Sequence, residues 1–105
     1  MVLGKIANVK QLLGQTTNVN DSKIGRYQII AYNFLNSSLT NIEPVIPLPS
    51  TVDPFLINFE EQLSAAYFWK FESGDQNTAD SLEKQFLTIY FKNKYNRPHQ
   101  ITRVY

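Results

Sequence analysis

A proline-rich stretch in the middle of the chain constrains the fold more than any other feature. Pro44, Pro47 and Pro49 fall within six residues. Each proline fixes φ, removes a backbone donor and pushes the residue before it toward extended geometry. Residues 43–52 are therefore predicted to form a semi-rigid extended connector. Asp53-Pro54 follows, an N-cap and a first helical residue that together predict the start of a helix.

The spacing of apolar residues predicts an all-α fold, a small bundle of about four helices in one domain spanning 1–105. Gly14 is placed to end the first helix, and Asn20 or Asp21 to cap the second. The predicted helices cover 6–13, 21–37, 54–71 and 78–92. In the third, Glu60, Glu61 and Gln62 are assigned to the solvent side. Residues 93–105 are predicted to be an extended basic tail, because Pro98 cannot continue a helix.

Residues that could carry chemistry are few. The chain has no cysteine, so disulfides and thiolate chemistry are excluded. His99 is the only histidine and has no partner ligands nearby in the sequence, so we interpret it as a surface residue. No phosphate-binding glycine loop occurs. We expect no catalytic residue, no cofactor and no metal, and no apolar run long enough for a membrane span or a signal peptide.

Charge is distributed in blocks along the chain. Residues 1–42 carry four cations and one acid, residues 43–83 carry eight acids and one lysine, and residues 84–105 carry five cations and no acid. The blocks suit head-to-tail contact between copies, with the acidic middle of one against the basic tail of the next. Chance clustering on a solvated surface is the alternative interpretation of the same pattern.

Tyr67-Phe68-Trp69-Lys70-Phe71 carries four rings over an arc of about 200° at 100° per residue. One small core is not expected to bury all of them, although small domains do bury rings densely. We therefore expect an intermolecular interface. Its predicted residues are Val45, Ile46, Leu48, Tyr67, Phe68, Trp69, Phe71, Phe91, Arg97, Arg103 and Tyr105.

The order of these segments resembles a known family. Asn8-Val-Lys-Gln-Leu-Leu-Gly14 precedes a helix, Val45-Ile-Pro-Leu-Pro49 follows it, and Asp53-Pro54 opens a helix containing Leu63-Ser-Ala-Ala-Tyr-Phe-Trp69. Over about residues 6–95 this is similar to the small head–tail connector (adaptor, head-completion) proteins of tailed bacteriophages and related viruses. The low charge and the short fourth helix with its basic tail depart from the family's pattern.

The resemblance implies a structural virion protein at the head–tail junction, made in the host cytoplasm. Its copies would form a ring of about twelve below the portal protein, extend the DNA channel and dock a tail or stopper protein. Packaged DNA would pass through the ring without sequence-specific contact. The resemblance implies no catalysis, and no membrane.

Other functions are also compatible with a small helical chain. A DNA-binding regulator would need an exposed recognition helix, for which residues 21–37 offer Lys23, Arg26, Gln28 and Asn33. The basic side chains around Tyr95, those of Lys92, Lys94, Arg97 and Arg103, could also contact nucleic acid. A tail-side virion protein such as a tail terminator is a further alternative.

Overall fold

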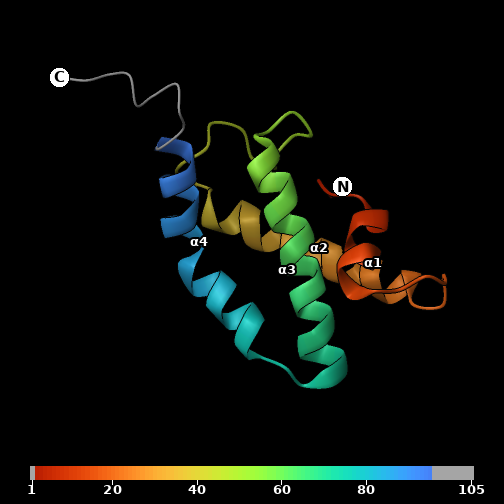
Figure 1. The fold of residues 1–105 in the computed structure, drawn as a ribbon. Helices are drawn as coiled ribbons and strands as arrows, with labels where there is room; N and C mark the ends of the chain where they lie inside the picture. Colours follow the sequence, from red (N-terminus) through yellow and green to blue (C-terminus); the bar gives the residue numbers. More distant parts are fainter. Residues whose placement is uncertain (1, 96–105) are drawn as a thin grey trace.

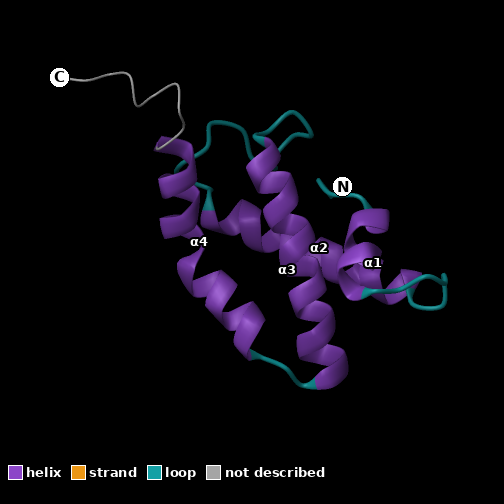
Figure 2. Ribbon diagram, in the orientation of Figure 1, coloured by secondary structure: helices purple, strands orange, loops and turns teal. Residues whose placement is uncertain are grey.

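A computed structural model describes residues 2–95, and within that range the chain is a bundle of four helices without strands (Figures 1 and 2). The all-α prediction is therefore confirmed. The helices are α1 (Ile6–Leu13), α2 (Asp21–Ser38), α3 (Pro54–Ser73) and α4 (Asn77–Tyr95). In this part of the chain no helix is both long and apolar enough to cross a membrane.

Local signals set the ends of the helices. Asp53 accepts a hydrogen bond from the Phe55 amide at 2.9 Å, and Pro54 is the first residue of α3. Gly14 and Gly74 end α1 and α3 with φ of 71° and 78°, a left-handed conformation that glycine adopts without strain. Asn20 is the N-cap of α2, but its side chain makes no capping hydrogen bond.

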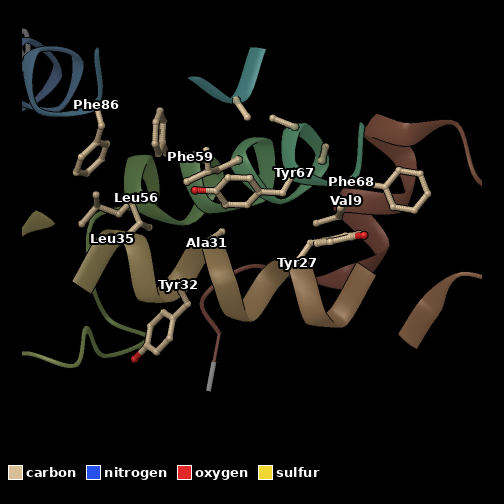
Figure 3. Close-up of a cluster of buried hydrophobic side chains, with 14 of the residues drawn as sticks. Val9, Tyr27, Ala31, Tyr32, Leu35, Leu56, Phe59, Tyr67, Phe68 and Phe86 are labelled. Carbon is tan, nitrogen blue, oxygen red and sulfur yellow. The ribbon is translucent and has the colours of Figure 1, made fainter. Parts of the chain in front are cut away.

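The core lies where α2 crosses α3, and Figure 3 shows the side chains that fill it. Leu35 on α2 and Leu56 and Leu63 on α3 are almost completely buried. Val9 brings α1 against the same core. Small residues on both long helices, Ala31 and Ala66, are also fully buried and allow the two backbones to approach closely.

The helix α4 runs back along α3 after a short turn, and aromatic rings fasten it to the core (Figure 1). Phe86 is 1% exposed, and its ring centroid lies 4.8 Å from that of Phe59 and 5.9 Å from that of Phe34. Tyr90 lies against Phe86 and donates a hydrogen bond to Glu43. The connector before α3 and the end of α4 are therefore tied together.

The proline-rich segment does not follow the straight extended course predicted for 43–52. It bends through 43–47, has a cis peptide between Ile46 and Pro47, and turns where the Val52 amide bonds to the Pro49 carbonyl. Leu48 is the anchor, since its amide bonds to Asn36 at 2.9 Å and its carbonyl accepts from Tyr32 at 2.8 Å. Side chains of α2 supply the backbone partners, so the segment lies across α2, as expected, but folded.

Candidate functional site

The predicted interface residues fall into four groups in the structure. Val45, Trp69 and Phe71 are exposed, whereas Ile46 and Phe91 are half-buried. Arg97, Arg103 and Tyr105 lie outside the described residues, as does the predicted extended tail beyond residue 95. The remaining three predicted residues, Leu48, Tyr67 and Phe68, are buried in the chain's own core.

Burial corrects the prediction for those three side chains. Leu48 is held by α2, and the Tyr67 hydroxyl donates to Glu83 of α4 at 2.5 Å. Phe68 meets Tyr27 of α2 edge to face at a centroid distance of 5.9 Å. Partners within the chain therefore occupy these side chains, which cannot contact another subunit in this conformation.

The last turn of α3 remains open to solvent. Phe71 stacks on Tyr27 at 5.7 Å, lies near the Tyr67 ring and the Lys70 ammonium, and is still 57% exposed. Trp69 is 36% exposed. Both rings lie at the end of α3 that connects to α4. The expectation that the ring cluster exceeds what the core can bury is confirmed for Trp69 and Phe71.

A hollow of about 220 Å³ lies beside Trp69, between α1, α3 and α4. Leu12 contributes from α1, Ala65 and Trp69 from α3, and Leu82 from α4. Leu12 is 48% exposed. The wall is mostly apolar, and small-molecule pockets usually have volumes of about 300–1,000 Å³, so the hollow is better matched to a side chain than to a whole ligand.

A larger polar groove of about 460 Å³ continues from this hollow along α1 and α3. The two cavities share Leu12 and Gln62 as lining residues. The polar groove is also lined by Asn8, Gln11, Asn58 and Glu61. We refer to the groove and the hollow together as the α1–α3 groove. Its lining contains one carboxylate and no cationic side chain.

Glu60 and Glu61 were predicted on the solvent side of α3, and that prediction was wrong. Glu60 is fully buried and accepts hydrogen bonds from the amides of Leu3 and Gly4 at 2.8 and 2.7 Å. Glu61, 5% exposed, accepts from the Lys5 amide and the Asn8 side chain. Main-chain amides at the start of the chain satisfy both carboxylates, and no local sequence signal indicates such distant partners.

Burial raises the pKa of Glu60, although the two amide hydrogen bonds oppose the shift. The opposite shift occurs at Glu72, whose pKa is lowered by hydrogen bonds from Tyr27 and Lys23. Burial and the hydrogen bond to Glu83 raise the pKa of Tyr67. Each of these three side chains is hydrogen-bonded within the fold: Glu60 to two backbone amides, Glu72 to Tyr27, and Tyr67 to Glu83. The shifts in pKa therefore follow from structural contacts.

The face of α2 that a DNA-binding regulator would use is largely occupied. Gln28 is buried and donates to the Gly4 carbonyl, and Lys23 pairs with Glu72 at 3.1 Å. Only Arg26 and Asn33 of the four candidate residues are exposed without such a contact. No cluster of side chains suited to a metal ion occurs within residues 2–95.

Comparisons with models of protein families, with curated proteins and with solved structures found no match to this chain. The functional interpretation therefore rests on the geometry described above and on the sequence pattern.

Proposed function

We propose that this chain is a structural virion protein of the head–tail connector type, assembling as a ring below a portal protein. The ring would extend the DNA channel and provide a docking surface for the tail. The observation that carries the proposal is the pair of exposed rings, Trp69 and Phe71, on a helix whose preceding residues 59–68 are buried except for Gln62.

Two further features support a protein-binding role. Large apolar side chains are exposed on α1, α2 and the connector as well, among them Leu12, Ile29 and Val45. The acidic block at 43–83 and the basic block at 84–105 supply opposite charges that could pair between copies. In a cyclic ring each contact is heterologous, so one face of a subunit meets a different face of its neighbour.

Mass measurement of the purified chain, alone and mixed with portal-bearing heads of the virus that encodes it, tests the proposal. We expect a defined number of copies, about twelve, on each portal vertex. A chain that stays monomeric and does not bind the heads would contradict it.

A paired substitution separates the interface from the fold. Changing Trp69 and Phe71 together to serine should abolish binding to the heads while the helical circular dichroism is retained. Leu87, 39% exposed on α4, provides the control. Leu87→Ser removes a similarly exposed apolar side chain away from the last turn of α3, and its binding should be unchanged.

A further inference from the structure

The α1–α3 groove has features of a site for an extended peptide. Gln11, Asn58 and Gln62 line it, and their side chains make no hydrogen bond within the described residues. Side-chain amides carry both donors and acceptors, so they can bond to an extended main chain in either direction. The apolar hollow at one end has room for a side chain of that peptide.

The charge of the groove selects among possible peptides. Glu61 is its only charged lining residue, and both hydrogen bonds it accepts from described residues arrive at Oε2. A peptide that combines arginine with large apolar side chains and lacks acids is therefore complementary.

The chain itself contains such a peptide. Residues 96–105 hold Arg97 and Arg103, no acid, and the sequence Ile101-Thr-Arg-Val-Tyr105. In an extended strand, alternate side chains share a face. Ile101, Arg103 and Tyr105 would then lie on one side, an apolar–cationic–aromatic set that matches the groove.

The position of α4 favours a second copy as the donor of this peptide. Thr78 and Leu82, in the first turns of α4, line the hollow, whereas α4 ends at Tyr95. Tyr95 is the thirteenth residue after Leu82 along the helix, a rise of about 20 Å at 1.5 Å per residue. Figure 1 shows the two ends of α4 at opposite ends of the bundle. A tail returning to its own groove would use most of its ten residues to retrace α4.

We infer that the α1–α3 groove binds the C-terminal segment, residues 96–105, of a second copy of this chain. The inference deepens the proposed ring, because a tail-in-groove contact is heterologous and can close a cycle. The ring in which this contact would occur rests on the proposed function. The contact itself needs only two copies of the chain and no portal.

Trp69 reports on the groove directly, because it is the only tryptophan and lines the hollow. A synthetic peptide of residues 96–105 is titrated into the full-length chain, and the tryptophan emission is followed. We expect a saturable blue shift that weakens as salt increases, because arginine contributes to binding. No shift at millimolar peptide would overturn the inference.

Substitutions on the groove and outside it provide matched controls. Leu12→Arg and Gln62→Lys each place a cation in the groove at an exposed position, and each should weaken peptide binding at least about tenfold. Leu87→Arg places the same charge on α4 outside the groove and should bind as the unchanged chain does. Equal weakening by Leu87→Arg would indicate general charge repulsion and overturn the inference.

A mixing experiment distinguishes a second copy from the chain's own tail. The Leu12→Arg variant has a disrupted groove but an unchanged C-terminal segment, and the Arg103→Glu variant has the reverse. Each variant alone should therefore stay monomeric in sedimentation, whereas an equimolar mixture should form a heterodimer. An Arg103→Glu chain that still self-associates would overturn the inference. So would a tryptophan emission that depends on Arg103 but not on protein concentration. Failure to bind portal-bearing heads, with the heterodimer intact, would contradict the proposed function alone.

Discussion

Two regions of the same helix, the middle of α3 and its last turn, differ sharply in their surroundings. From Phe59 to Phe68 every side chain except that of Gln62 is buried, and the buried set includes two glutamates. From Trp69 to Ser73 no residue is buried, and Phe71 is 57% exposed. The sequence is rich in aromatic residues across the boundary, so hydrophobicity alone does not mark it.

The difference arises from what packs against each region. The middle of α3 is surrounded by α2 on one side, α4 on another and the segment before α1 on a third. Around the last turn the contacts are at its edges: Tyr27 of α2 stacks on Phe71, and exposed ion pairs join Glu72 to Lys23 and Lys70 to Asp80. A single helix thereby supplies the centre of the core and, at its end, an apolar surface available to a partner.

Truncation in the buried region should have the largest effect. Leu63 is completely buried, so Leu63→Ala leaves a cavity in addition to losing the transfer free energy of the side chain. We expect the free energy of unfolding to fall by about 2–5 kcal/mol. Urea denaturation followed by circular dichroism measures it. A loss no greater than that of Phe71→Ala would show that the two regions do not differ in packing.

Substitution of the buried carboxylate should have the next largest effect. Glu60→Gln sets an amide nitrogen against one of the two backbone donors from Leu3 and Gly4. An unsatisfied buried group of this kind costs about 1–3 kcal/mol. Urea denaturation at neutral pH should show this loss, and an unchanged midpoint would show that the hydrogen bonds from Leu3 and Gly4 to Glu60 do not stabilise the fold.

The same carboxylate should also set a pH dependence. Because the pKa of Glu60 is raised on folding, the native chain binds more protons between the unfolded and the folded pKa, and stability falls as pH rises through that window. Glu60→Gln should flatten this decline when stability is measured as a function of pH. Glu72→Gln is the control, since the lowered pKa of Glu72 produces a loss as pH falls instead.

Removing a single hydroxyl should have a smaller effect. Tyr67→Phe keeps the ring in the core but deletes the hydrogen bond to Glu83, which is partly exposed and can be rehydrated. We expect a loss of about 1 kcal/mol by thermal or urea unfolding. Glu83→Gln retains an acceptor and should lose less. An equal loss from both variants would imply that the charge of Glu83, rather than the tyrosine hydroxyl, provides the stability.

The smallest effect on stability is expected in the last turn. Phe71→Ala removes a half-exposed ring and its stack on Tyr27, for a loss of about 0.5–1 kcal/mol. The same variant should lower binding to portal-bearing heads, measured by co-sedimentation. Normal binding by Phe71→Ala would show that Phe71 does not take part in the interface, and Trp69 would then be the ring that contacts the portal-bearing heads.

Local signals made the helices predictable. Asp53-Pro54 begins α3, and glycines end α1 and α3, because capping and left-handed geometry depend on residues only a few positions apart. The ring arc of Tyr67–Phe71 likewise predicted that some rings would remain exposed. It could not identify Trp69 and Phe71 as the exposed pair, because that depends on where α2 and α4 pack.

Non-local contacts were beyond the sequence pattern. Two adjacent glutamates such as Glu60 and Glu61 are typical of a solvated helix face. They are buried acceptors here because residues 3–8, distant in the sequence, pack against them and donate hydrogen bonds. Leu48 lies in a proline-rich apolar segment of the kind that docks on a partner, but Asn36 and Tyr32 of the same chain hydrogen-bond to its backbone. The α1–α3 groove depends on three helices at once, and no single segment indicates it.

The contact between the first residues and α3 also bears on the order in which the molecule is completed. The Leu3 amide finds its acceptor 57 positions later in the chain, at Glu60, and the Lys5 amide finds its acceptor 56 positions later, at Glu61. On a ribosome, residues 3–5 therefore emerge long before their partners exist. An ideal Cβ on Gly4 would lie 2.3 Å from Glu61 Cγ, so this late docking also requires a residue without a side chain at that point. The start of the chain is synthesised first and reaches its final position only after α3 has been made.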